Sequence, residues 1–256
     1  MRWDPSQYAR YASERSRPFF DLTERIAAEA PRRVVDAGCG SGELTAVLAQ
    51  RWPDATVEGF DSSAEMVAAA QQHATAALTF RVEDVRDWTM PPDTDVLVSN
   101  AALQWVPRHV DLLATWAAQL PRGGWLAVQV PGNFDAPSHR IMRELAESPR
   151  WAPALSGVLR HHHAVATPEW YAEVLLDAGL VADVWETTYL HVLSGTDPVL
   201  EWVRGTGLRP VLSALDEANA QLFEREYAAR LREAYPATPN GTVFPFRRIF
   251  LVGSRP

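Results

Sequence analysis

The stretch Asp36-Ala37-Gly38-Cys39-Gly40-Ser41-Gly42 joins a short apolar run, residues 33–37, to residues 43–50, where apolar positions recur at helical spacing. Glycines at such a junction let the backbone turn sharply between a strand and a helix and approach a ligand closely. The stretch therefore predicts a strand, a turn and a helix. By itself it is compatible with a plain structural turn or with a ligand-binding loop.

The spacing of the three glycines narrows the choice of ligand. A dinucleotide-binding fingerprint, G-x-G-x-x-G, requires glycine at the position of Glu43, whereas here the third glycine is Gly42. Asp36 closes the strand before the loop, and a carboxylate there repels a pyrophosphate. A cationic ligand is the better match.

Polar residues also follow the next three predicted strands, which cover residues 55–61, 78–82 and 95–99. The carboxyl ends of parallel strands form the ligand-binding edge of a sheet. At that edge, a carboxylate accepts both hydroxyls of a ribose, and an acid beside a backbone amide suits an adenine. Together the polar residues at the strand ends indicate a ligand that contains a nucleoside and a positive charge. The predicted cofactor-binding residues are Asp36, Gly38, Gly40, Gly42, Asp61, Ser62, Asp84, Val85, Asn100 and Ala101.

The remaining chain completes an α/β pattern. Ser62 is expected to cap a helix over residues 64–73, and repeated strand–helix units predict a parallel sheet with helices on both faces. A single domain, residues 1–256, is expected, with a cofactor-binding core at 30–135 and an N-terminal cap at 1–29. Further helices are predicted at 110–119, 136–148 and 167–178, strands at 124–130, 181–193 and 243–252, and a helical insertion at about 197–238 as a lid.

Composition limits the function classes. The chain has 256 residues and a net charge of −8, and this acidic balance disfavours nucleic-acid binding. It contains no apolar run of membrane-spanning length, its N-terminus carries no apolar stretch of signal-peptide type, and it has one cysteine, so we expect a cytoplasmic protein. All 24 basic residues are arginines, whose planar fork suits carboxylates.

The sequence resembles the class I methyltransferases through DAGCGSG, GFDSS and VEDVRDW, which match the motifs of that family in order and spacing over residues 30–135. The resemblance implies a Rossmann-like α/β fold with a mostly parallel seven-stranded sheet, and S-adenosyl-L-methionine as cofactor. Cys39 is interpreted as a packing residue. The segment after Asn100 lacks the Pro-Pro-aromatic pattern of nucleic-acid adenine methyltransferases, which also disfavours a nucleic-acid substrate.

Over its whole length the chain is similar to the trans-aconitate 2-methyltransferases. The stretches that carry this similarity run from end to end of the chain and include parts that the cofactor fold does not dictate. Among them are Trp3-Asp4-Pro5, Glu14 to Pro18, Asn100 to Trp105, Leu126 to Gln129, Trp185 to Tyr189, Thr206 to Pro210 and Phe246 to Phe250. The resemblance implies transfer of a methyl group to one carboxylate of trans-aconitate or a similar small polycarboxylic acid, giving a monomethyl ester.

Such a reaction depends on alignment of the attacking oxygen, the methyl carbon and the sulfur more than on acid–base catalysis. A carboxylic acid is ionised at neutral pH, so we expect no general base, no catalytic residue and no metal, and His161-His162-His163 is interpreted as loop. Arg15 and Arg17 are expected to precede a helix that Pro18 begins, and only one of Arg247 and Arg248 is expected to face the site. The predicted substrate-binding residues are Arg15, Arg17, Tyr11, Gln104, Trp105, Tyr189, His191, Arg209, Arg247 and Arg248.

Two alternatives stay open from the sequence. One is a methyltransferase for another small acid or for a malonyl group on an acyl carrier. The other belongs to a different class: a nicotinamide-dependent oxidoreductase, or a nucleotide-binding module without catalysis.

Overall fold

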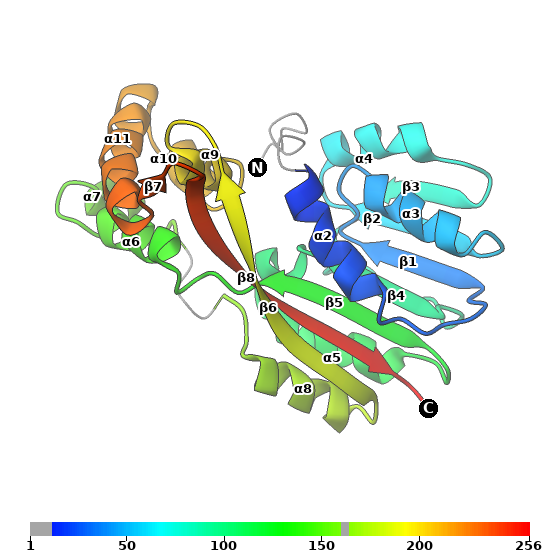
Figure 1. Cartoon of the computed structure of the whole chain (residues 1–256). Helices are drawn as coiled ribbons and strands as arrows, with labels where there is room; N and C mark the ends of the chain where they lie inside the picture. The colour runs from blue at the N-terminus through cyan, green and yellow to red at the C-terminus, as the bar shows by residue number, and fades with distance from the viewer. Residues whose placement is uncertain (1–11, 160–163) are drawn as a thin grey trace. The chain divides into compact units, whose positions relative to one another are not determined.

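The computed structural model describes residues 12–159 and 164–256, with side chains from Ser16 onward (Figure 1). The chain forms two compact units. Unit 1 comprises Met1–Pro131, Ala166–Thr187 and Arg248–Pro256, and unit 2 comprises Gly132–Val165 and Thr188–Arg247. The expectation of a single domain over residues 1–256 stays a prediction.

One mixed sheet organises the chain, in the strand order β3-β2-β1-β4-β5-β8-β6. The five N-terminal strands pair in parallel, and β8 runs antiparallel to β5. Seven strands on one path confirm the predicted Rossmann-like sheet. The strands are β1 (Arg33–Ala37), β2 (Thr56–Asp61), β3 (Leu78–Val82), β4 (Val96–Asn100), β5 (Trp125–Pro131), β6 (Val181–Leu193) and β8 (Gly241–Ser254).

A further strand, β7 (Ala237–Thr238), pairs with the start of β8, and the sequence does not predict it. The register Thr238↔Gly241 closes a tight turn, in which the Thr238 hydroxyl donates to the Gly241 carbonyl over 2.7 Å. Two residues are too few for a period-of-two pattern, so sequence periodicity does not reveal this strand.

Strand β1 lies between β2 and β4, so the chain changes direction across the sheet there. In such sheets a ligand binds at the carboxyl ends of the strands beside this switch point. Val34 and Val35 of β1 are both fully buried although they face opposite sides, which requires a covering layer on each face. In its described residues, unit 1 has the α-helices α2 (Ala12–Thr23), α3 (Glu43–Arg51), α4 (Ala64–Ala70), α5 (His109–Gln119) and α8 (Pro168–Asp177) (Figure 1).

The start of α2 differs from the prediction. The helix begins at Ala12 and contains Pro18, so Arg15 and Arg17 lie inside it and do not precede it. Proline inside a helix removes a hydrogen bond and is unfavourable in isolation. Phe19 and Leu22, which follow it, are fully buried, and α2 contacts β4 and β5. This burial offsets the local cost of the proline.

Unit 2 contains the whole of the predicted helical insertion. Helices α9, α10 and α11 lie within residues 197–238, and α11 packs against α9 and α6. Trp202, Phe223, Tyr227 and Phe244 form a fully buried core there. The lid role of this insertion stays a prediction. The helices of unit 2 are α6 (Pro137–Ala146), α7 (Ala152–Leu155), α9 (Pro198–Arg204), α10 (Arg209–Ala214) and α11 (Glu217–Ala234).

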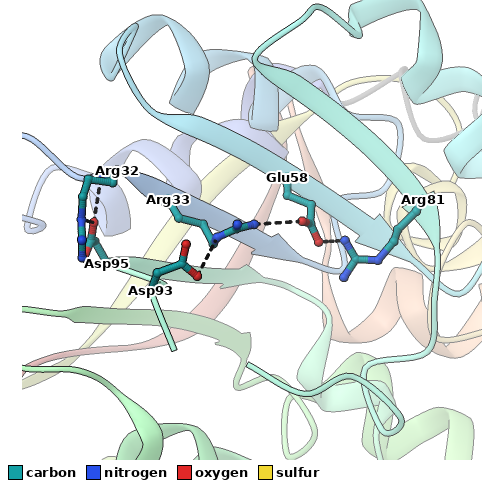
Figure 2. A network of polar contacts seen from close by, with 6 residues as sticks. All are labelled: Arg32, Arg33, Glu58, Arg81, Asp93 and Asp95. Carbon is teal, nitrogen blue, oxygen red and sulfur yellow. Dashed lines mark hydrogen bonds and ion pairs between the residues drawn. The ribbon is translucent and has the colours of Figure 1, made fainter. Parts of the chain in front are cut away.

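The segment between β3 and β4, all of which the structure describes, contains no helix. A network of charged side chains connects strands β1, β2 and β3 (Figure 2). Glu58 of β2 lies between Arg33 of β1, 3.6 Å away, and Arg81 of β3, with which it makes a direct ion pair. Asp93 adds a 3.0 Å contact to Arg33. The Glu58 side chain is only 13% exposed, so its charge depends on the two arginines for compensation.

Replacing Glu58 by glutamine should lower the free energy of unfolding by about 1–3 kcal/mol, because two guanidinium groups lose their shared counter-charge. Urea denaturation measures this loss. Asp111→Asn is the matched control, since the ion pair of Asp111 with Arg108 is highly exposed on both sides. Equal stabilities of the Glu58 variant and the control would contradict the expectation.

Within the described residues, no helix is both long enough and apolar enough to cross a lipid bilayer.

Candidate active site

The glycine loop adopts a backbone that other residues rarely reach. Gly38, Gly40 and Gly42 have φ values of +85°, +54° and +78°. A Cβ at Gly38 would overlap the Ala102 Cβ, and a Cβ at Gly42 would lie 2.9 Å from the Phe80 ring. The first of these close approaches packs the loop after β1 against the segment after β4. The loop therefore needs glycine for packing as well as for its turn.

Asp36, at the end of β1, is 3% exposed, and its Oδ2 accepts a hydrogen bond of 2.7 Å from the Thr45 hydroxyl of α3. Burial raises the pKa of Asp36 to about 7. The Thr45 hydrogen bond opposes this increase, and the charge of Asp61 adds to it. A carboxyl group held this way favours a nearby cation, because a positive charge stabilises its ionised form.

Asp61, at the end of β2, fastens two backbone segments to each other. Its Oδ2 accepts from the Gly40 N–H over 3.1 Å, and its Oδ1 accepts from the Ser63 N–H over 2.9 Å. Burial raises the pKa of Asp61, and the backbone hydrogen bonds oppose that shift. The carboxylate thus lies beside the glycine loop, as the spacing of the strand ends predicts.

The cap of α4 corrects a prediction. Ser63 begins the helix, and its Oγ accepts from the Met66 N–H over 3.2 Å, whereas the predicted cap, Ser62, is exposed. The shift by one residue follows from Asp61, whose hydrogen bond to the Ser63 N–H forms a turn over residues 61–63. The predicted helix over 64–73 ends at Ala70 and continues as a 3₁₀ turn, Gln71–His73.

The third strand end carries a carboxylate that already has a partner. Arg86 binds Asp84 through Nε at 2.9 Å and NH2 at 2.6 Å, and the Arg86 backbone N–H also donates to it. The side-chain hydrogen bond lowers the pKa of Asp84 below its usual value. The carboxylate is therefore ionised, and its lone pairs are shared with a guanidinium. The roles of Asp84 and of Val85, which is half-buried, toward an adenine stay predictions.

The end of β4 and the turn after it hold an unusual backbone conformation and two side-chain oxygens that lack a hydrogen-bond partner among the described residues. Ala101 has φ +55°, outside the usual range for alanine, and its N–H donates to the Gln129 carbonyl over 2.9 Å. Gln104 is 6% exposed and donates its Nε2–H to the Ala101 carbonyl over 2.5 Å. The buried Asn100 Oδ1 and Gln104 Oε1 have no hydrogen-bond partner in the described part of the chain. Trp105 is half-buried beside them in a 3₁₀ turn.

Three of the predicted substrate-binding arginines belong to unit 1. Arg17 is exposed on α2 and lies 3.9 Å from Asp21. Arg248, on β8, is 6% exposed, and its NH1 donates to the Gln129 Oε1 over 3.3 Å. The side chain of Arg15 and all of Tyr11 fall outside the described residues, as does the run His161-His162-His163. The rest of the chain, which the structure describes, shows no cluster of three metal-ligating side chains.

The other predicted substrate-binding residues belong to unit 2. Tyr189 and His191 are buried with stacked rings 6.2 Å apart, and His191 also stacks on Trp202 at 4.7 Å. Arg209 begins α10 and is half-buried. Arg247 is half-buried and donates through its backbone N–H to the Asn133 Oδ1 over 2.7 Å. Convergence of these residues with those of unit 1 on one substrate stays a prediction.

A methyltransferase-domain family model matches residues 11–183. The trans-aconitate 2-methyltransferase of Streptomyces avermitilis is 56% identical, over 99% of this chain and 97% of its own length. That of Rhodococcus jostii is also 56% identical, over 98% of both chains. The chain belongs to the trans-aconitate 2-methyltransferase family. The predicted family is confirmed, and the alternatives of an oxidoreductase or a module without catalysis fall away.

Structural similarity agrees with this fold. Geranyl diphosphate C-methyltransferase from Streptomyces coelicolor, solved with S-adenosyl-L-homocysteine, superposes with a TM-score of 0.55 over 98% of this chain and 82% of its own. Its sequence is 17% identical, so the comparison bears on the fold alone. The class I methyltransferase fold predicted from the motifs is thereby confirmed.

Cys39, the one cysteine of this methyltransferase, is buried beside Gly59. Burial raises the pKa of its thiol, and the charges of Asp36 and Asp61 add to the increase. A thiol that stays protonated is a poor nucleophile, which supports the interpretation of Cys39 as a packing residue.

Two residues at this edge are not among the predicted site residues. Thr45 orients Asp36, and Gln129 is a fully buried amide inside the otherwise apolar strand β5. The signal for Gln129 is present in Leu126-Ala127-Val128-Gln129-Val130, because a polar side chain in a strand buried on both faces needs a partner.

The titration of Asp36 makes stability depend on pH. In the folded protein its pKa is about 7, against an ordinary value of 3.8, so between these values the folded state keeps a proton that the unfolded state has released. Raising the pH through this window therefore removes stability, and the loss is complete above pH 7. Asp36→Asn should be more stable than the parent protein by about 2–4 kcal/mol at pH 8, with little difference near pH 4.

Urea denaturation of both proteins without cofactor, from pH 4 to pH 8, measures this difference. A difference that stays constant across the range would show that the Asp36 carboxyl is not the titrating group.

Proposed function

We propose that this methyltransferase uses S-adenosyl-L-methionine to methylate one carboxylate of trans-aconitate, or of a similar small polycarboxylic acid, and so forms a monomethyl ester. The observation that carries the proposal is 56% identity over almost the full length to relatives named for this activity. Because the identity extends beyond the cofactor core, it includes the regions that distinguish substrates.

The strand ends fit the cofactor. The glycine loop brings backbone close to the carboxyl end of β1, and Asp61 presents a partly buried carboxylate beside it. The buried Asn100 Oδ1 is an acceptor still without a partner among the described residues, which suits a donor on a ligand. Gly38, Gly40, Asp61 and Asn100 would hold the bound cofactor, with Asp84 and Val85 toward its base. When bound, the cofactor supplies the methyl group as a sulfonium electrophile.

The side chains then have to place an ionised carboxylate in line with that methyl group. The oxygen is already a nucleophile at neutral pH, so positioning supplies the rate acceleration. Arg248 offers a buried positive charge, which compensates a carboxylate that does not react. No proton has to be removed from the attacking oxygen.

The direct test is mass spectrometry of the products formed from S-adenosyl-L-methionine and a panel of acids. The panel contains trans-aconitate, cis-aconitate, citrate, tricarballylate and a malonyl-loaded acyl carrier protein. We expect one added methyl group on trans-aconitate, released by mild base as an ester is. Methylation of the acyl carrier substrate alone would overturn the proposal in favour of the malonyl alternative.

The pH profile of the reaction provides a second test. With saturating cofactor and trans-aconitate, the single-turnover rate should change less than threefold between pH 6 and pH 8, because the nucleophile is ionised throughout. A tenfold rise per pH unit that a His191→Ala variant abolishes would indicate a catalytic base instead.

A further inference from the structure

Gln129 occupies a position where an amide is costly. It lies near the carboxyl end of β5, which is an inner strand of the sheet, is fully buried, and is flanked along the strand by the buried apolar residues Val128 and Val130. A buried polar side chain in such a strand is tolerated when each of its hydrogen-bonding atoms has a partner. Among the described residues, one polar atom of the Gln129 side chain has a partner and the other does not.

Arg248 orients the amide. Its NH1 donates to the Gln129 Oε1 over 3.3 Å, and a guanidinium can only donate, so the amide oxygen must face it. The Gln129 Nε2 then points elsewhere, and this buried donor has no hydrogen-bond partner in the described part of the chain. An unpaired buried donor destabilises a folded protein, so the presence of this donor is not explained by folding stability and indicates a role in binding.

The unpaired donor lies at the ligand-binding edge of the sheet. In the register of β4 and β5, Gln129 is the neighbour of Asn100, which ends β4 at the switch point. On its other side, the β5–β8 register pairs Gln129 with Phe250 and Pro131 with Arg248. The neighbouring strands β4, β5 and β8 (Figure 1) therefore carry a row of three polar residues, Asn100, Gln129 and Arg248, all within unit 1.

We propose that Gln129 is a substrate-binding residue, whose Nε2–H donates to a carboxylate of the substrate that does not react, while its oxygen holds the Arg248 guanidinium for that same carboxylate. An amide donor and a guanidinium match a carboxylate, which only accepts hydrogen bonds. The row would thus distinguish an ionised carboxylate from an ester or amide at this position. This inference rests on the proposed function of the site.

Two substitutions separate binding from folding. Gln129→Met keeps the length of the side chain but removes both its donor and the oxygen that accepts from Arg248, so KM for trans-aconitate should rise about 10- to 100-fold. The thermal midpoint should stay within a few degrees of the parent value, because removal of the unpaired buried donor offsets the loss of the 3.3 Å hydrogen bond from Arg248. Gln129→Glu places a carboxylate against Arg248 and toward the substrate, so KM should rise by about 100-fold or more while the thermal midpoint is unchanged or higher.

Thr94→Val is the matched control. Thr94 is also fully buried, with a hydroxyl that has no partner among the described residues, but it precedes β4 at the opposite edge of the sheet. Its KM should equal that of the parent protein. In all variants the affinity for S-adenosylhomocysteine, measured by calorimetry, should change less than threefold.

Three dicarboxylates, each lacking one carboxylate of trans-aconitate, identify the group that is bound: itaconate, glutaconate and mesaconate. The rise in KM caused by Gln129→Met should disappear for the one acid that lacks the carboxylate bound by Gln129. The inference would be overturned if the rise in KM were equal for every acid, or if the variant lost folding stability but kept the KM of the parent protein. Absence of turnover by the parent protein on every acid would instead refute the proposed function.

Discussion

Asp61→Ala should weaken binding of S-adenosylhomocysteine by about 2–4 kcal/mol, which corresponds to about 30- to 900-fold. The Asp61 carboxylate has one role in the structure and a second role in the proposed function. It accepts hydrogen bonds from the Gly40 and Ser63 N–H groups, which fastens the glycine loop to the start of α4. In the proposed function it also accepts the hydroxyls of a ribose. Alanine removes both tasks, and its effect is therefore expected to be large.

Asp61→Asn distinguishes the two tasks, because asparagine keeps one acceptor oxygen and the shape of the side chain. We expect it to lose less affinity than alanine but more than the control. Asp87→Ala serves as the control, since this acid is exposed in the loop after β3. Calorimetric titration measures all three. A folded Asp61→Ala protein with parent-like affinity would remove Asp61 from the cofactor site.

Arg248→Ala should weaken transition-state stabilisation for trans-aconitate, measured through kcat/KM, by about 2–5 kcal/mol. The reason is that a substrate carboxylate would be left without its counter-charge in a partly dehydrated site. Arg248 is the member of the Arg247–Arg248 pair that is buried in the sheet, and Gln129 holds its guanidinium. Arg248→Lys should recover part of the loss, since an ammonium restores the charge but not the planar fork. Binding of S-adenosylhomocysteine should barely change.

Arg108→Ala is the control for charge alone, because the Arg108 side chain is 86% exposed. Arg209→Ala and Arg247→Ala test the predicted substrate-binding arginines of unit 2 in the same assay. Parent-like kcat/KM in Arg248→Ala would leave the substrate assignment without support from this arginine. Parent-like values in the other two would confine substrate recognition to unit 1.

Residues close in sequence account for what could be predicted without a structure. The strand from Arg33 to Ala37, the glycine turn and the helix from Glu43 depend on neighbours only a few residues apart, and their predicted bounds agree with β1 and α3 to within one residue. The acids at the strand ends follow from the same local pattern. Because strands of this length end where apolar runs end, Asp61 and Asn100 could be placed at one edge of the sheet.

Long-range packing accounts for features that local patterns miss. Pro18 locally favours a helix start, yet burial of Phe19 and Leu22 carries α2 through it. Alternation along β8 shows that Arg247 and Arg248 face opposite ways, but only the pairing with β5 shows which of them is buried against Gln129.

The family, the parallel core and the strand-end positions of the predicted cofactor-binding residues were accessible from the amino-acid order, because they depend on local spacing and on motifs that a short segment contains in full. The satisfied oxygen of Gln129 and its unsatisfied nitrogen became visible only in the folded chain, since the partner Arg248 lies 119 residues away. The hydrogen-bond balance of a buried side chain depends on strands that meet only in the folded sheet, and no periodicity along the chain records it.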